Sequence, residues 1–552
     1  MLRLSYTAAG RRTIFDSLFP AASPYGVGVT RSHFCLPWLI LALAPAATGA
    51  AMFDLVLRHG RIVDGTGRPA SMADVAVQDG RIAAVGENLG EAKQVIDARG
   101  LVVVPGFIDV HTHADDLAEL PRAENFVRMG VTTVVAGNCG SSAVDIAKFF
   151  RDVEATNVSV NVATLIGHGS VRSQVMGGSF LRPPTVDELA RMQALVRQGM
   201  RDGAVGLSTG LIYLPGTYAK AEELIEVARP VAEFDGIYTS HMREEGVKIL
   251  DGLNELFRVA RETRVRAEIS HIKLSGPAAW GRTKQVLAAI QRARAEGLRV
   301  TQDEYVYTAS STSLSQLVPE EWRDRETFSK ALAAAAARSN LVAQMKARLK
   351  TNKRDNYAYA VIADYPHDAS LNGLNVVEAA RKKHGTGSLA EQIELILDIH
   401  AHGGATGVFH GISENDLQKF LRDPNTMIAS DSGVRKFQEG APHPRGYGNN
   451  ARVLARYVGE LKILRLEDAV RRMTSLPATT FQLRERGELR AGNRADLVVF
   501  DLAKVRDAAT FGDPHHYATG FAWVFVNGVA VVKDDQHTGA RPGMALRHVV
   551  GP

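Results

Sequence analysis

Residues 104–113 read VPGFIDVHTH, a largely apolar run that ends in two histidines. Such a run is typical of a strand in a parallel sheet, because helices cover both faces of that sheet. His111 and His113 are two positions apart, so on a strand their side chains point to the same face. This stretch predicts a buried parallel strand with a pair of imidazoles at its carboxyl end.

Seven further runs of the same kind follow along the chain. They are TTVVAGNCG (132–140), NVATLIGH (161–168), GAVGLSTGLIY (203–213), GIYTSHMR (236–243), RAEISHIK (266–273), RVTQDEYVY (299–307) and TMIASDS (426–432). Helical segments alternate with them, which predicts an α/β fold with a closed (β/α)₈ TIM-like barrel. Each run ends in polar residues of catalytic type, and the carboxyl ends of barrel strands are where active sites form.

Short strands are expected on both sides of this barrel. Asp79-Gly80 and Asn527-Gly528 each separate two alternating apolar runs, which is the signal of a two-residue hairpin. Sheets of this size need a partner face to bury. We therefore expect residues 52–105 and 485–552 to form one small composite β-sandwich domain beside a barrel of residues 106–484.

More than a hundred residues separate the seventh and eighth runs. This is too long for a simple barrel loop, and the segment contains stretches of helical composition such as 328–349. We predict a helical insertion at about residues 312–425 that lies over the mouth of the barrel.

Residues 1–51 differ in character from the rest of the chain. Arg31 precedes an apolar run at 34–44, and small residues follow it, which is the layout of a signal peptide. The run is too short to span a bilayer comfortably. We expect a periplasmic or secreted protein with no integral membrane segment in the mature chain. The alternative is a cytoplasmic enzyme that begins near Met52.

Charge and cysteine content exclude several classes of protein. The 65 basic and 60 acidic residues are spread along the chain, without the dense basic block that nucleic-acid binding requires. Cys35 and Cys139 are too few for a disulfide framework. A small-molecule substrate is the expected partner.

His241 and His271 end the fifth and sixth runs in the parallel phrases SHMR and SHIK. Neighbouring barrel strands then present both imidazoles at the mouth where His111 and His113 also lie. Either histidine alone is more often structural, but four imidazoles at one mouth predict a metal site.

Cys139 follows the second run in the phrase GNCG, whose glycines predict a bend. One interpretation is an inert buried thiol, because free cysteine packs as a small apolar side chain. The other is a ligand: a thiolate with two imidazoles suits Zn²⁺ and leaves a fourth position open for water.

Asp431, in the phrase IASDSG of the eighth run, is the candidate general base and acid. Amide hydrolysis needs a group that takes a proton from metal-activated water and later gives it to the leaving nitrogen. A carboxylate beside the metal can do both. The alternative is a helix N-cap, because Ser432 and Gly433 follow it.

Together these phrases resemble the amidohydrolase superfamily, and more narrowly its D-aminoacylase branch, the N-acyl-D-amino-acid deacylases. The general marks are GRIVDGTG, VPGFIDVHTH with Asp115 after it, and GELRAGNRADLVVFD; the narrower ones are GNCG, GLSTGLIYLPG, SHMR, SHIKLSG, SDSG and HPRGYG. The resemblance runs from about Phe53 to Gly543. It implies zinc-dependent hydrolysis of the amide bond of N-acyl-D-amino acids to a D-amino acid and a carboxylate.

The resemblance also implies roles for the metal-site residues. Cys139, His241 and His271 would bind the tight zinc, and His111 and His113 would line a second, weaker metal position. Asp431 would act as the general base and acid.

Three further residues match positions that hold the substrate α-carboxylate in that family: Tyr305, Ser311 and Arg445. An arginine suits this role because its planar fork matches a carboxylate. The family usually has proline where this chain has Val306. Lys273 is a further candidate, either for an acidic substrate side chain or for the scissile carbonyl.

Two alternatives remain open. Cyclic-amide hydrolases of the dihydropyrimidinase, hydantoinase and dihydroorotase kind commonly bridge two metals with a carboxylated lysine, but Cys139 stands where that lysine is expected. An inactive barrel scaffold is the other alternative, and the complete set of candidate ligands argues against it.

Overall fold

The computed structural model describes residues 52–549, so the predicted leader lies outside the described residues. Each of the eight sequence runs forms a barrel strand, which confirms the predicted fold. In order of pairing the strands are β6 (Phe107–Asp109), β8 (Val131–Ala136), β9 (Asn161–Thr164) with β10 (Ile166–Gly167), β11 (Gly206–Gly210), β12 (Ile237–His241), β13 (Arg266–Ile269), β14 (Val300–Glu304) and β18 (Thr426–Ile428). The barrel closes where β19 (Ser432–Gly433) pairs in parallel with β7 (Thr112–His113).

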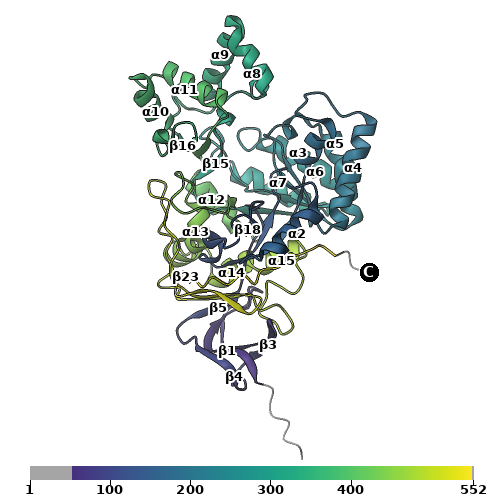
Figure 1. The fold of residues 1–552 in the computed structure, drawn as a ribbon, viewed down its shortest axis with the longest axis vertical. Helices are drawn as coiled ribbons and strands as arrows, with labels where there is room; N and C mark the ends of the chain where they lie inside the picture. The colour runs from purple at the N-terminus through teal and green to yellow at the C-terminus, as the bar shows by residue number, and fades with distance from the viewer. Residues whose placement is uncertain (1–51, 550–552) are drawn as a thin grey trace, which may run out of the picture. The chain divides into compact units, whose positions relative to one another are not determined.

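Helices between the strands cover the barrel (Figure 1). They include α2 (Ile146–Thr156), α3 (His168–Met176), α4 (Val186–Arg201), α5 (Ala221–Glu233), α6 (Ile249–Thr263), α7 (Thr283–Ala295), α12 (Glu414–Arg422) and α14 (Leu466–Met473). Helix α4 shows why they form: Thr185 and Glu188 make a capping box at its start, and Met192, Val196 and Met200 recur every four residues on its buried face. None of the described helices combines the length and apolar composition needed to cross a membrane.

Strands from both chain ends form one continuous sheet of nine strands. They are β1 (Phe53–Ile62), β2 (Ser71–Gln78), β3 (Arg81–Gly86), β4 (Ala92–Asp97), β5 (Val102–Pro105), β20 (Leu497–Phe500), β21 (Phe521–Val526), β22 (Val529–Lys533) and β23 (Gln536–His537). The two ends join where β5 pairs antiparallel with β20. Asp79 and Asn527 take left-handed backbone angles at the two predicted hairpins.

A hydrophobic cluster fills the space that this sheet encloses. Leu55 and Val77 from the amino-terminal strands contact Leu497 and Val499 from the carboxyl-terminal strands within it. The hydrogen bonds connect all nine strands, so both chain ends contribute to one small sheet domain beside the barrel, as predicted. The final residues depart from the expected domain, because residues 544–546 leave the sheet and bond to Val162 of β9.

The insertion between β14 and β18 contains both helices and strands. The helices are α8 (Arg325–Ala333), α9 (Ala335–Thr351), α10 (Val376–His384) and α11 (Leu389–Ala401), and a three-stranded sheet joins β15 (Ala309–Ser313), β17 (Thr406–His410) and β16 (Ala360–Asp364). The sequence prediction of a helical segment at about 312–425 missed this sheet, because a strand such as ASSTS carries no apolar alternation. Helix α12, inside the predicted range, packs against α7 and β18 of the barrel instead.

A buried ion pair links the nine-stranded sheet to the barrel. Asp496, next to β20, pairs with Arg486, and both side chains are almost fully buried. The same carboxylate accepts hydrogen bonds from the Asn161 side chain of β9 and, at 2.8 Å, from the backbone N–H of Asn527. Three groups, two of them more than thirty residues away along the chain, therefore converge on one carboxylate.

We predict that Asp496→Asn lowers the free energy of unfolding by about 3–5 kcal/mol, because it leaves the Arg486 guanidinium buried without its counter-charge. Urea denaturation followed by circular dichroism measures this change. The control is Asp355→Asn at an exposed position, for which we expect a change of less than about 0.5 kcal/mol. Equal midpoints for both variants would contradict the assigned role of the ion pair.

Candidate active site

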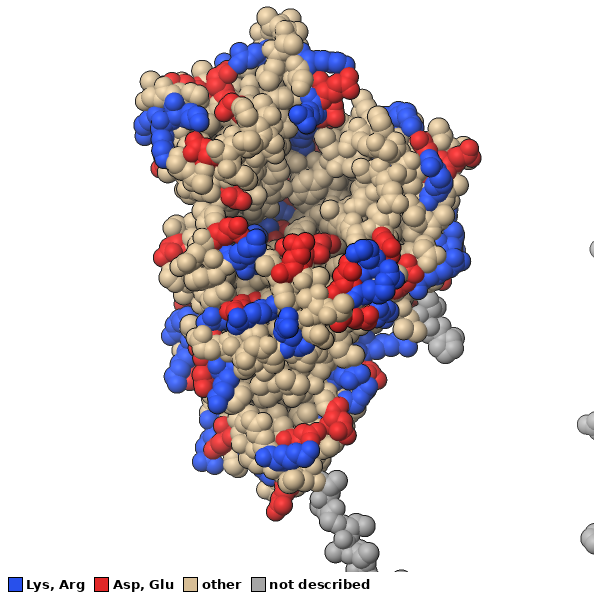
Figure 2. Space-filling view, viewed as in Figure 1, with Lys and Arg blue, Asp and Glu red and all other residues tan. Residues whose placement is uncertain are grey.

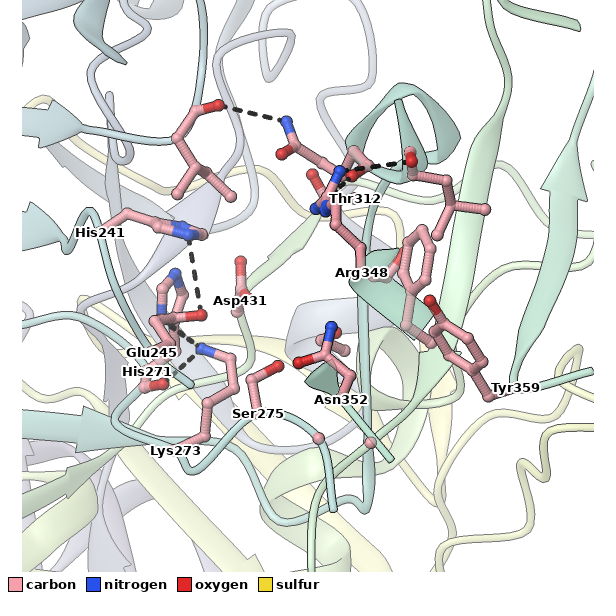
Figure 3. Close-up of a pocket in the computed structure, with 18 of the residues that line it drawn as sticks. His241, Glu245, His271, Lys273, Ser275, Thr312, Arg348, Asn352, Tyr359 and Asp431 are labelled. Carbon is pink, nitrogen blue, oxygen red and sulfur yellow. Dashed lines mark hydrogen bonds and ion pairs between the residues drawn. The ribbon is translucent and has the colours of Figure 1, made fainter. Parts of the chain in front are cut away.

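Six candidate residues converge at the carboxyl end of the barrel strands, as predicted. His111 and His113 follow β6, Cys139 follows β8, and His241 ends β12. His271 follows β13 and Asp431 follows β18, and Figure 3 shows these two side chains near His241 at one side of a cavity. Segments that are hundreds of residues apart thus deliver their side chains to one place.

The thiol of Cys139 is at the centre of this group. Its Sγ lies 3.6 Å from Nδ1 of His241 and 3.7 Å from Nε2 of His271. In a tetrahedral zinc site, bonds of about 2.3 Å to sulfur and about 2.0 Å to nitrogen separate these donor atoms by about 3.6 Å. The donor types and these two distances suit a zinc site, and the donor atoms of Cys139, His271 and also His111 all lie within 4.8 Å of one another.

Charge in the group favours a thiolate. Burial alone would raise the pKa of the Cys139 thiol, but His111, whose Nε2 is 3.3 Å from Sγ, holds that pKa well below its usual value. Because the thiolate is the form that binds metal ions, this environment argues against an inert thiol.

Strained backbone aims three of these side chains. Cys139, His271 and Asp431 all have positive φ, at 54°, 36° and 50°, a region that non-glycine residues rarely adopt. Gly140 beside Cys139 also has a positive φ, and a Cβ there would lie 2.8 Å from the backbone nitrogen of Gly210. Such strain is costly, at about 1–3 kcal/mol per residue, and it clusters at functional sites.

A second group of donors adjoins the first. His111, His113 and Asp431 place one donor atom each within 4.8 Å of one another. Oδ1 of Asp431 is 3.2 Å from Nε2 of His113 and 3.6 Å from Nε2 of His111. The structure therefore brings together His111 and His113, the residues expected at the weaker metal position, and adds Asp431 beside them.

Asp431 pairs with Arg445 at the start of α13 (Arg445–Arg452). Nη1 of the guanidinium is 2.8 Å from Oδ2 of the carboxylate, and both groups are buried. Burial would raise the pKa of Asp431, but Arg445 above all holds it well below its usual value. Asp431 precedes the short strand β19, so it does not cap a helix.

The residues predicted to hold the substrate take different positions. Ser311 lines the cavity beside Asp431 and accepts a hydrogen bond from Nη2 of Arg445 at its backbone carbonyl. Tyr305 is completely buried, with its ring 4.5 Å from the Arg445 guanidinium. Lys273 is bound within the protein: Nζ lies 2.7 Å from Oε1 of Glu245 and 2.8 Å from Nδ1 of His271.

Sequence reasoning missed two carboxylates that orient the histidines. Asp303, in β14, accepts a hydrogen bond of 2.9 Å from the backbone N–H of His271, and its other oxygen is 3.2 Å from Nδ1 of His111. Glu245 lies beside His271 and Lys273. Asp303 follows the pattern of polar residues at strand ends, whereas Glu245 lies in the loop after β12, and the partners of both are visible only in the folded chain.

Two connected cavities open onto these residues. The inner cavity, of about 190 Å³, lies between His241, His271 and the insertion. The outer cavity, of about 950 Å³, reaches from Cys139 and Arg445 to the insertion loop at 403–406. Tyr213, Ser311, Thr312 and Asp431 line both. Figure 2 shows the surface hollowed between the insertion and the helices α3 to α6.

Several proteins that are similar to this chain are named as enzymes. The model of the amidohydrolase family matches residues 94–532. A D-aminoacylase of Alcaligenes xylosoxydans xylosoxydans is 36% identical, covering 90% of this chain and 97% of that protein. An N-acyl-D-glutamate deacylase of the same organism is 35% identical, covering 90% of this chain and 96% of that protein.

A solved structure extends the similarity to three dimensions. It is an N-acyl-D-glutamate deacylase from Bordetella bronchiseptica, complexed with zinc and a phosphonate inhibitor that mimics the tetrahedral intermediate of the reaction. At 34% identity it covers 90% of this chain and 100% of that chain, with a TM-score of 0.77. The chain belongs to the amidohydrolase family and, within it, to the D-aminoacylase branch.

Asp303 should determine how firmly the histidines are held. We predict that Asp303→Asn weakens metal affinity or activity about 10- to 100-fold, because groups that orient ligating histidines typically contribute that much. Competition with a chelator measures the affinity. The matched control is Asp416→Asn, a buried carboxylate that bonds Gly281 and Thr283 away from the site. An Asp303→Asn protein with unchanged affinity and activity would contradict this role.

Proposed function

We propose that this protein is a zinc-dependent N-acyl-D-amino-acid deacylase. It hydrolyses the amide bond of an N-acyl-D-amino acid and releases a D-amino acid and a carboxylate. The observation that carries the proposal is the buried Cys139 thiol between His241 and His271, with the Asp431–Arg445 pair beside it.

The donor set supports zinc as the metal. Cys139, His241 and His271 would hold the tight ion, because thiolate and imidazole are ligands that zinc prefers. His111, His113 and Asp431 would hold a second ion more weakly. The ion would polarise the scissile carbonyl and activate water at neutral pH.

Asp431 is placed to carry protons. Its carboxylate lies beside the candidate metal ligands His111 and His113, where it can accept a proton from the attacking water. The same carboxyl can then deliver that proton to the leaving nitrogen. His113 and Arg445 contact different oxygens of the carboxylate and hold it in one orientation.

Arg445 is placed to receive the α-carboxylate of the substrate. Taking a carboxylate out of water is costly unless a charged partner replaces the lost hydration. Nε of Arg445 is buried and donates no hydrogen bond to any described residue. Arg445 lines the outer cavity beside Ser311, so a carboxylate that enters that cavity can approach its guanidinium.

A turnover screen with parallel metal analysis tests the proposal. Purified protein should contain zinc and should hydrolyse at least one N-acetyl-D-amino acid faster than its L-enantiomer. Cys139→Ala should lose both zinc and turnover, whereas His111→Ala should lose turnover but retain a good fraction of the zinc. Hydrolysis of dihydropyrimidines or hydantoins alone would identify a cyclic-amide hydrolase. A Cys139→Ala protein with full zinc and normal turnover would overturn the ligand assignment.

The Arg445→Ala substitution tests carboxylate recognition. We predict a loss of about 2–5 kcal/mol in kcat/KM for an N-acetyl-D-amino acid, the range for removing one partner of a buried charged pair. Arg445→Lys should recover only part of this, because lysine cannot present a planar fork. The methyl ester of the same substrate serves as the comparison.

Comparing the acid with its ester separates the contact of Arg445 with Asp431 from its contact with the substrate carboxylate. A loss shared by acid and ester reports on the contact with Asp431, and the additional loss on the acid reports on the substrate carboxylate. Equal losses on both substrates would show that Arg445 supports only Asp431.

A further inference from the structure

The inner cavity separates the candidate metal ligands from the insertion. Figure 3 shows His241, His271, Lys273 and Asp431 toward one side and Thr312, Arg348, Asn352 and Tyr359 toward the other. The insertion also contributes Arg354 and Phe409 to the lining. The far wall of the cavity therefore comes from the inserted segment and not from the barrel.

The charged groups on the barrel side of this cavity are already paired. Glu245 is 2.7 Å from Nζ of Lys273, and Asp431 is 2.8 Å from Nη1 of Arg445. These are the two carboxylates that line the inner cavity. Each therefore has its counter-charge within the protein.

The two arginines on the insertion side have no such partner. Arg348 donates to the backbone carbonyls of Leu317 and Gln316, at 3.3 and 3.1 Å. Arg354 donates to the carbonyl of His410 at 2.6 Å and stacks on Tyr359, 3.8 Å from the ring centroid. Neither guanidinium lies within ion-pair distance of a carboxylate of the described chain. The cavity thus carries two uncompensated positive charges.

Positive charge that faces a confined cavity favours an anionic occupant. Arg354 is half-buried and Arg348 is exposed, and both guanidinium groups line the cavity, where they can attract a carboxylate. Ser275 and Asn352, which face one another in Figure 3, add neutral hydrogen-bonding groups beside the arginines. This wall is therefore suited to a carboxylate.

We propose that the inner cavity receives the side chain of the D-amino acid and that Arg348 and Arg354 select an acidic side chain. The proposal rests on the proposed function. A substrate α-carboxylate at Arg445 lies in the outer cavity beside Ser311, which lines both cavities, and the side chain on the same α-carbon can enter the inner one. The acyl group then occupies the outer cavity, which is larger.

This assignment differs from the expectation for Lys273. That lysine was a candidate for pairing with an acidic substrate side chain, but Glu245 and His271 already occupy its ammonium group. Recognition of the side chain therefore falls to residues of the insertion.

The wild-type protein provides the first test. We expect kcat/KM for N-acetyl-D-glutamate to exceed that for N-acetyl-D-glutamine, its neutral isostere, by about tenfold, the contribution of a charge-assisted hydrogen bond. Added salt should reduce the ratio, because it screens a charge interaction and not the fit of the isostere.

Variants then assign the preference to the arginines. Arg348→Gln and Arg354→Gln should each lower the glutamate-to-glutamine ratio by about tenfold, the effect of losing one charge-assisted contact. Arg348→Lys should restore part of the ratio. Lys346→Gln is the matched control, because Lys346 lies on the same helix, is exposed and does not line the cavity. If the arginines only brace the insertion, both substrates should lose activity equally.

The possible outcomes separate this inference from the proposed function. If no N-acyl-D-amino acid is hydrolysed, the proposed function fails. If kcat/KM for N-acetyl-D-leucine or N-acetyl-D-glutamine equals that for N-acetyl-D-glutamate, the deacylase function stands and the inference is overturned. A preference for N-succinyl over N-acetyl-D-leucine that disappears in Arg348→Gln would assign the cavity to the acyl group, which also overturns it.

Discussion

Burial of many ionisable groups around the Cys139 thiol is the constraint on which the rest of this structure depends. A thiol, four imidazoles and several carboxylates lie together at the carboxyl end of the barrel strands, where each unpaired buried charge would be costly. The structure gives partners to these groups: His111 lies beside the thiol, Asp303 beside His111, and Arg445 beside Asp431. The barrel can hold such a set because its strands are short, parallel and fixed by packing on both faces.

The site combines two parts of the chain with different tasks. Barrel strands supply the candidate metal ligands and Asp431 on a rigid frame, at positions where strained backbone directs the side chains. The insertion between β14 and β18 has its own hydrophobic core, formed by residues such as Leu341, Met345 and Ile396. It adds a wall of different chemistry to the cavity. The barrel residues that would carry the chemistry and the insertion residues that would select the substrate can therefore change independently.

This division of tasks between the barrel and the insertion explains why similarity to the relatives does not identify the preferred substrate. A D-aminoacylase and an N-acyl-D-glutamate deacylase match this chain at 36% and 35% identity, so overall similarity does not distinguish them. The phrases that identify the family lie mostly on the barrel strands. Arg348 and Arg354, to which we assign the selection of the substrate, lie in α9 and the residues after it, where no family phrase was found.

The sequence by itself determined the barrel, because eight apolar runs with polar ends can be read from local pattern. It also identified His111, His113, Cys139, His241, His271 and Asp431, since their residue types and strand-end positions are local features. Only the tertiary structure decided which groups are paired. Lys273 could serve substrate or protein until Glu245 was found beside it, and Arg348 and Arg354 resembled ordinary helix and loop residues. The physical reason is that charge compensation depends on distances between segments far apart in the chain, and no local pattern encodes those distances.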